Sequence, residues 1–204
     1  RGADILTERS TAGSGFLAEV CREWEAATEP ASQRGVRVVR LRTGIVLSRS
    51  GGARAKMMLP FQLGLGGMLG SGRQYMSWLT LEDQVSIIHH LLENSSLTGP
   101  VNAVAPNPAM NREFTKTLGK VLKRPTLFPM PAFAVKLAFG EMGAEALLSS
   151  ARVEPERLLA TGFRFQYPSL EGALRQALNK IPTEKRVSMP ARKIVRPSAP
   201  ARDV

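Results

Sequence analysis

The apolar positions of the chain first outline a helix followed by strands. In the predicted helix, over about residues 14–27 with Ser14 as its N-cap, the apolar residues recur at helical spacing. They are Phe16, Leu17, Val20, Trp24 and Ala27. Gly35 separates this helix from a β-branched run at 36–41, which predicts a strand, and a second short strand is expected at 45–47.

Further along, the pattern predicts a helix capped by Thr80 and a strand near 101–106. The expected core face of that helix is Val85, Ile87, Ile88, Leu91 and Leu92. From Asn111, a third predicted N-cap, the chain changes to helices with short connections. One apolar stretch is expected to break at Gly140 and Gly143, and Ser169 should cap the last helix. Helices that alternate with strands predict an α/β fold with a parallel sheet.

Composition limits the classes of protein considered. No run of about 18 apolar residues occurs, so a membrane-spanning helix is not expected. Cys21 is the single cysteine and the first residues carry no secretory pattern, which together favour a reducing, cytoplasmic setting. The chain begins with Arg1 rather than methionine, so we expect a fragment or a processed product.

The net charge of +11 raises the question of nucleic-acid binding. Residues 180–204 contain seven basic and two acidic residues, so +5 of the excess lies there and +6 (11 minus 5) elsewhere. This stretch has four prolines and no apolar periodicity, which predicts a disordered basic tail. Nucleic acid is disfavoured as a partner because no aromatic residues interleave with the basic ones.

Two local motifs have alternative interpretations. Five glycines between Gly64 and Gly72 could cradle a phosphate or allow tight turns; turns are favoured because the motif lacks a P-loop ending. The adjacent His89 and His90 lack the spacing of a helical metal pair, so no metal site is predicted. A strand that ends in the Gly-containing loop after Leu47 is typical of a ligand crevice in open α/β sheets.

Several long motifs occur in an order that resembles a known family. They are FLAEVCREWEAA, VVRLRTGIVLSRSGG and MLPFQLGLGGMLGSGRQYMSWLTLEDQ. Together they resemble an atypical branch of the extended short-chain dehydrogenase/reductases, the epimerase-family or nucleoside-diphosphate-sugar epimerase-like proteins. The segment from Phe114 to Leu174 resembles their small C-terminal helical domain, and the resemblance covers about residues 2–178.

The resemblance implies a domain organisation and a cofactor. Residues 1–109 would be the C-terminal part of a Rossmann-like NAD(P)-binding domain, and 110–179 the small, mostly helical C-terminal domain. The Gly-rich pyrophosphate loop of the family is absent from the printed residues, so NADP (or NAD) would bind only together with an N-terminal half. The nicotinamide end would lie at Val46, with Gly44 and Leu47 beside it; a plain core role for Val46 is the alternative.

The resemblance also implies a substrate side without a catalytic residue. An unknown small-molecule substrate could bind in an apolar pocket lined by Met58, Phe61 and Trp78. The alternative for each of these residues is core packing. Met76 stands where related epimerases carry a diphosphate-binding arginine. Leu17 and Cys21 stand where the catalytic tyrosine and lysine of typical members would lie, and leucine has no proton to exchange.

Three hypotheses follow. The first is an NAD(P)-dependent oxidoreductase or epimerase-like protein, which would be inactive as this chain alone. The second is a non-catalytic regulatory or scaffolding protein with the same fold, related to cell division. The third is nucleic-acid binding through the tail. A homodimer is a further expectation from the family.

Overall fold

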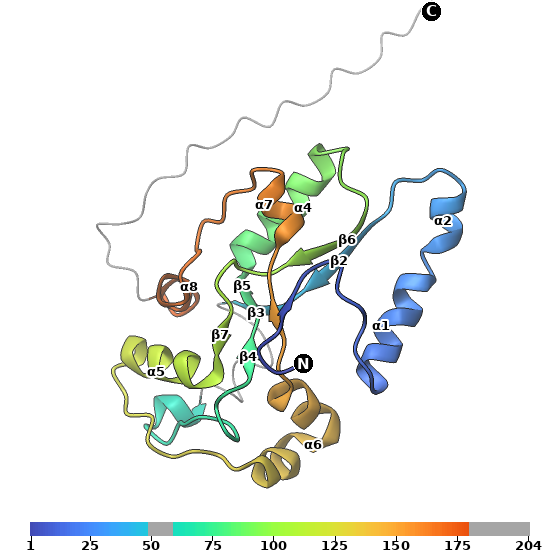
Figure 1. The fold of residues 1–204 in the computed structure, drawn as a ribbon. Coiled ribbons are helices and arrows are strands. Elements are labelled where there is room, and N and C mark those ends of the chain that lie inside the picture. Colours follow the sequence, from blue (N-terminus) through green and yellow to red (C-terminus); the bar gives the residue numbers. More distant parts are fainter. Residues whose placement is uncertain (49–58, 180–204) are drawn as a thin grey trace, which may run out of the picture.

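The computed structural model describes residues 1–48 and 59–179. Its elements in chain order are β1 (Ile5–Leu6), α1 (Phe16–Ala26), α2 (Glu29–Gln33), β2 (Val39–Thr43), β3 (Ile45–Leu47), β4 (Tyr75–Met76), β5 (Trp78–Thr80), α4 (Leu81–Glu93), β6 (Gly99–Ala103), β7 (Ala109–Met110), α5 (Asn111–Leu122), α6 (Ala132–Leu148), β8 (Arg152–Val153), α7 (Glu156–Ala160) and α8 (Leu170–Ala177). Figure 1 shows α4 and α7 above the central strands, α5 and α6 at the opposite end, and α1 and α2 to one side. The expected basic tail at 180–204 lies outside the described residues.

Short strands form four pairs at the centre of the molecule. The pairs β2–β6, β3–β5 and β1–β8 are parallel, and β4–β7 is antiparallel. β2 begins later than the predicted start at Val36, because the Val36 N–H donates to Ala31 O, 3.1 Å away, and so closes the turn after α2. β3 has the predicted bounds. The parallel pairs, with helices around them, give the α/β architecture.

Three apolar clusters hold the elements together. The first joins α4, β6 and α7 through residues such as Ile87, Val101 and Leu158. The second surrounds Trp78, and the third packs α5 on α8. The last two share Leu47 as a partly buried neighbour, so the end of β3 is anchored on both.

Two of the four predicted N-caps are correct. Thr80 Oγ1 accepts from the Asp83 N–H at 3.1 Å and Ser169 Oγ from the Gly172 N–H at 3.3 Å, as expected. The predictions for Ser14 and Asn111 are wrong: α1 is preceded by Gly15 and α5 by Met110. Asn111 instead turns inward, and its Oδ1 accepts from the Leu69 N–H at 2.8 Å.

The predicted apolar faces are buried only in part. In α4, Ile87 and Leu91 are buried, whereas Val85 and Leu92 are 60% and 72% exposed. No side chain of α1 is buried, and Trp24 is 72% exposed. Helical spacing identifies an apolar face, but the neighbours available decide how much of that face is covered.

Of the two breaks predicted within α6, the structure confirms one. Gly140 has φ 72° and ψ 178° and breaks the helical path, whereas the path continues through Gly143. The left-handed φ at Gly140 is one that glycine adopts at little cost. Within the described residues, no helix is both long enough and apolar enough to cross a bilayer.

Candidate functional site

Gly44 marks the carboxyl end of β2, where the chain passes unusually close to its neighbours. Its N–H donates to Ala103 O at 3.1 Å. A Cβ at this position would lie 2.6 Å from Ser77 O and 2.8 Å from Val104 Cγ1. Only a residue without a side chain allows this approach. Gly44 can therefore contact a ligand through its main-chain atoms alone.

Val46 follows on β3 and presents its backbone to an open side. The Ile45 N–H donates to Ser77 O at 2.8 Å, and Val46 is paired with Leu79 in the parallel β3–β5 ladder. Because alternate residues of a parallel strand bond to one neighbour, the N–H and C=O of Val46 point away from β5. No other strand pairs with β3 among the described residues, and the Val46 side chain is 37% exposed.

The other predicted contacts lie mostly in the core. Leu47 is partly buried between two clusters. Trp78 is 0% exposed, and its Nε1–H donates to Asn107 O at 3.1 Å. Phe61 packs against the cluster of α5 and α8. Met58 lies outside the described residues. The structure therefore brings Gly44, Val46 and Leu47 to one strand end, while Trp78 lies in the core and Phe61 is partly buried against it.

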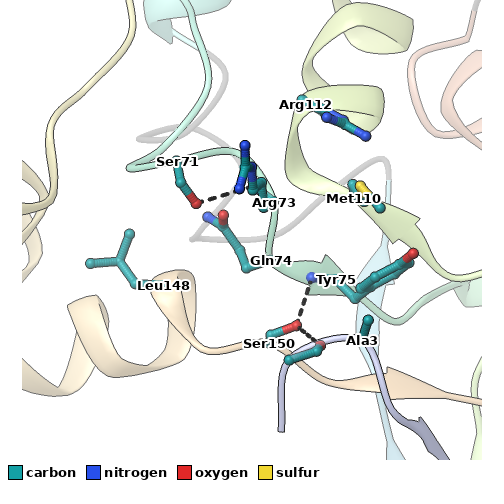
Figure 2. A pocket seen from close by; sticks show the side chains of 10 residues that line it. Ala3, Ser71, Arg73, Gln74, Tyr75, Met110, Arg112, Leu148 and Ser150 are labelled. Carbon is teal, nitrogen blue, oxygen red and sulfur yellow. Dashed lines mark hydrogen bonds between the residues drawn. The ribbon is translucent and has the colours of Figure 1, made fainter.

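The structure also contains a groove that the sequence did not reveal. Its volume is about 620 Å³, and its lining comes from the N-terminal loop, the loop before β4, β4 itself, the start of α5 and the segment that ends α6 (Figure 2). The lining residues are Gly2, Ala3, Ser71, Arg73, Gln74, Tyr75, Met110, Arg112, Leu148 and Ser150. These residues are scattered along the chain, and only the glycines before Arg73 hinted at a close approach here.

Side-chain hydrogen bonds fix the floor of the groove. Ser150 Oγ accepts from the Tyr75 N–H at 3.1 Å and donates to Gly2 O at 2.5 Å, as Figure 2 shows. Gln74 is 7% exposed, and its Nε2 donates to Leu69 O at 3.0 Å and to Leu147 O at 3.3 Å. The groove therefore has a pre-formed floor that these hydrogen bonds hold in place.

Ser77 connects this floor to the end of β2. Its Oγ donates to Ala151 O at 2.7 Å and accepts from the Val153 N–H at 2.9 Å. Its carbonyl oxygen accepts from Ile45 and closes the space above Gly44. Ala151 follows Ser150 directly. Hydrogen bonds of Ser77 to Ala151 and Ile45 therefore connect the floor of the groove with β3.

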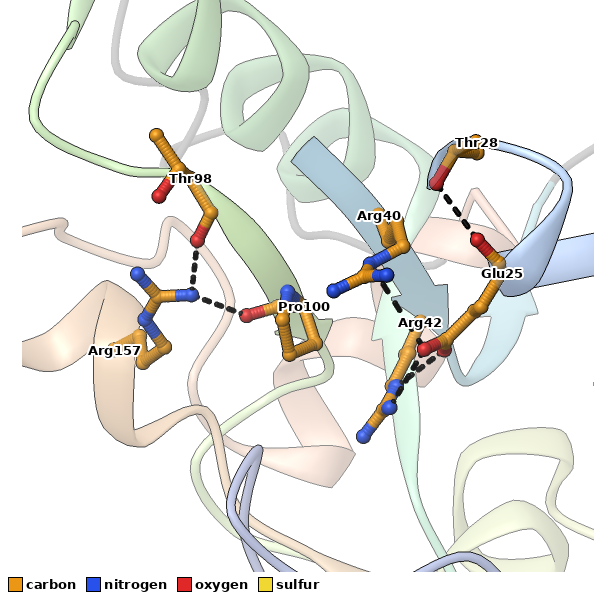
Figure 3. Close-up of polar contacts among 7 residues, drawn as sticks. All are labelled: Glu25, Thr28, Arg40, Arg42, Thr98, Pro100 and Arg157. Carbon is orange, nitrogen blue, oxygen red and sulfur yellow. Dashed lines mark hydrogen bonds and ion pairs between the residues drawn. The ribbon is translucent and has the colours of Figure 1, made fainter. Parts of the chain in front are cut away.

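A charged pair holds α1 against β2 beside the strand end. Glu25 receives hydrogen bonds from Arg42 Nε at 2.6 Å and Arg42 Nη2 at 2.9 Å, and Arg40 Nε lies 4.0 Å away (Figure 3). The Arg42 hydrogen bonds lower the pKa of Glu25, and attraction by both arginines adds to this effect against the opposing effect of burial. The same bonds raise the pKa of Arg42. Both groups stay charged at neutral pH.

α1 and α4 carry the remaining candidate residues. Leu17 is half-buried and Cys21 exposed. His89 Nδ1 lies 3.2 Å from Glu93 Oε2, and His90 Nε2 lies 2.9 Å from Thr161 Oγ1, so both histidines have structural partners. Over residues 1–48 and 59–179, no three His, Cys, Asp or Glu side chains converge as metal ligands.

Comparison with known proteins identifies relatives over most of the chain. It is 46% identical over 176 residues to Epimerase family protein Mb2239 of Mycobacterium bovis, which is 86% of this chain and 58% of that protein. The family model described as Domain of unknown function (DUF1731) matches residues 130–177. The chain thus spans somewhat more than half the length of such relatives.

Two solved structures share the fold at 38% sequence identity. Human epimerase family protein SDR39U1 (isoform 2), crystallised with NADPH, superposes with a TM-score of 0.81 over 89% of this chain and 61% of that one. The nucleoside-diphosphate sugar epimerase from Corynebacterium glutamicum gives 0.68 over 87% and 34%. The predicted Rossmann-like α/β fold is therefore confirmed.

Proposed function

This chain belongs to the epimerase family, and on that premise we propose that it forms the nicotinamide end and the substrate side of an NAD(P)-dependent oxidoreductase or epimerase site. The proposal concerns part of a site, because the chain spans 58% of the mycobacterial relative. The NADPH in the human SDR39U1 structure supports the choice of cofactor.

The observation that carries the proposal is the backbone of Val46, whose N–H and C=O point away from β5 and face no other described strand. The carboxamide of nicotinamide has one carbonyl acceptor and one amino donor, which match the N–H and C=O of a strand residue directed away from its partner. Ligands of open α/β sheets bind beyond the carboxyl ends of parallel strands, where Gly44 and Val46 lie. The groove, joined to this point through Ser77, would receive the substrate.

The affinity of the 204-residue chain for the whole cofactor should be low. In this fold the pyrophosphate is bound by a Gly-rich turn between a strand and a helix, and the printed residues contain no such motif. We expect a dissociation constant for NADPH of about 1 mM or weaker, which corresponds to about 4 kcal/mol of binding free energy.

Nuclear magnetic resonance (NMR) can test the site despite weak binding. The ¹⁵N-labelled chain would be titrated with nicotinamide riboside, and with adenosine as the control that lacks the nicotinamide. We expect saturable shifts of the backbone amides of residues 44–47 with the first compound only. Shifts confined to other residues, or equal shifts with adenosine, would remove the basis of the proposal.

A second candidate is a non-catalytic protein that keeps the fold, and one observation favours it. By the family resemblance, Leu17 stands where typical short-chain dehydrogenases carry their proton donor, and leucine cannot transfer a proton. Leu17 is half-buried on α1. The test is NADPH consumption, with a panel of carbonyl compounds, by a longer protein in which this chain is joined to an N-terminal half that carries the pyrophosphate loop. Binding of NADPH by that protein without its consumption would favour this candidate, whereas reduction of any carbonyl compound would contradict it. A role in cell division, a cytoplasmic location and a homodimer stay predictions.

A further inference from the structure

We propose that the groove binds a small organic anion, whose carboxylate or phosphate group is held by Arg73 and Arg112 and whose apolar part lies against Met110 and Leu148. The inference deepens the proposed function, on which it rests, by giving the charge class of the substrate. By the resemblance, Met76 stands where related epimerases carry a diphosphate-binding arginine. In this chain the proposed cationic groups are instead those of Arg73 and Arg112.

The described lining of the groove carries charge of one sign. Among the residues that the structure describes, it contains two arginines and no aspartate or glutamate. Neither arginine forms an ion pair with a carboxylate in the described part of the chain. The nearest carboxylate along α5 is that of Glu113, whose Oε2 accepts from the Met110 N–H at 2.9 Å. Two guanidinium groups in a concave site are therefore available to an anion, and each can bind an oxyanion in a bidentate manner.

Backbone contacts bring the two arginines together from distant parts of the chain. The Arg112 N–H donates to Gly72 O at 2.9 Å, and the Arg73 N–H donates to Ser71 Oγ at 3.3 Å. Gly72 has φ +66°, and a Cβ there would lie 2.8 Å from Met68 Sδ and 3.3 Å from Arg112 Cβ. The loop can approach α5 this closely because the residue is glycine, which places Arg73 next to the first turn of α5.

The rest of the groove suits an apolar body rather than a strongly polar one. The Nε2 donor of Gln74 and the hydroxyl of Ser150 have their hydrogen bonds occupied within the floor. Arg152 lies over the ring of the lining residue Tyr75, with its Cζ 5.2 Å from the ring centre, which adds a positive charge beside the groove. Figure 2 shows Leu148 on the α6 side and Met110 beside Tyr75 on the opposite side. An anion with an apolar portion would satisfy both parts of the lining.

The test uses three ring compounds of similar size and different charge. Binding of phenyl phosphate, benzoate and neutral benzyl alcohol to the 204-residue chain would be followed by NMR, without any nucleotide. We expect saturable shifts at residues 71–75 and 110–112 with at least one anion, and much weaker effects of benzyl alcohol. The tighter of the two anions identifies phosphate or carboxylate as the favoured group.

Variants then assign the binding to the arginines. Arg73→Gln and Arg112→Gln should each weaken anion binding about tenfold, since a hydrogen bond to a charged group is lost in each. Arg→Lys at either position should retain part of the affinity, and Arg34→Gln, at the end of α2, is the matched control with no expected effect. The amide spectrum of each variant reports whether it is folded.

Three results would overturn the inference: no saturation by either anion in the millimolar range, equal affinity for benzyl alcohol, or unchanged affinity in folded R73Q and R112Q chains. The proposed function is tested separately, because nicotinamide riboside carries no phosphate and is monitored at residues 44–47. The failure of one proposal can therefore be distinguished from the failure of the other.

Discussion

At the scale of single residues, Glu25 is the main polar link between α1 and β2. Its carboxylate receives two hydrogen bonds from Arg42 and lies near Arg40, while α1 buries none of its side chains. The Glu25 side chain is 27% exposed, so solvent screens the pair only in part. The position of α1, which carries Leu17, therefore depends on a charge pair at the edge of the proposed site.

Glu25→Gln should lower the free energy of unfolding at pH 7 by about 1 kcal/mol, in the upper range for partly exposed ion pairs. Because the pKa of Glu25 is lowered in the folded chain, the unfolded chain binds more protons as the pH falls through the ordinary glutamate value of about 4.3. The stabilisation is complete above that value and is lost as the pH falls through the lowered pKa.

Urea unfolding at several pH values measures this difference. The gap between the two proteins should close in acid, and Glu23→Gln, at an exposed position of the same helix, should change little. A gap that does not narrow as the pH is lowered through the acid range would show that the effect of the substitution is not electrostatic.

At the scale of elements, α4 is an amphipathic helix in which some apolar side chains are buried and others are exposed. Ile87 is 0% exposed and lies in the cluster with Val101 and Leu158, whereas the adjacent Ile88 is 43% exposed. Consecutive helical residues point about 100° apart, so these two identical side chains lie on different faces. Apolar content alone does not distinguish them.

Ile87→Ala should therefore cost about 3 kcal/mol of unfolding free energy, since it removes buried methyl groups and leaves a cavity. Ile88→Ala should cost less than about 1 kcal/mol, because its side chain is partly in water already. Thermal and urea unfolding of the two variants give a matched comparison. Similar losses for both would show that the Ile88 face of α4 is covered in solution.

At the scale of the whole molecule, Asp83 joins two segments that are far apart in the sequence. It is 0% exposed, its Oδ1 accepts from the Gln166 N–H at 2.7 Å, and its Oδ2 accepts from the Tyr167 N–H at 3.2 Å. Thr80 Oγ1 also donates to Oδ2 at 2.9 Å. The carboxylate thus fixes the start of α4 to the chain that leads into α8.

Asp83→Asn should destabilise the protein by about 3 kcal/mol, because the amide cannot accept from all three donors and a buried donor is left unpaired. The loss should appear in urea unfolding and in faster proteolysis near residues 160–169. Glu93→Gln, whose side chain is 63% exposed, is the control and should lie within about 0.5 kcal/mol of the parent chain. A D83N chain as stable as its parent would mean that these hydrogen bonds contribute little.

The sequence predicted those features that depend on near neighbours. Thr80 and Ser169 cap their helices as expected, because an N-cap bond spans only three residues. Ser14 failed because Gly15 stands between it and α1, and Asn111 failed because its amide contacts Leu69 instead. Propensity favours a cap but does not decide between local and distant partners.

The sequence by itself determined the α/β class, the bounds of β3, the break at Gly44 and, through long motifs, the similarity to epimerase-family proteins. These depend on periodicity and on residues adjacent in the chain. Only the tertiary structure decided that Trp78 is buried in the core, that Val46 directs its backbone to an open edge, and that Arg73 and Arg112 share a groove. Such facts depend on contacts between segments tens of residues apart, whose geometry follows from the packing of the whole chain and not from any local pattern.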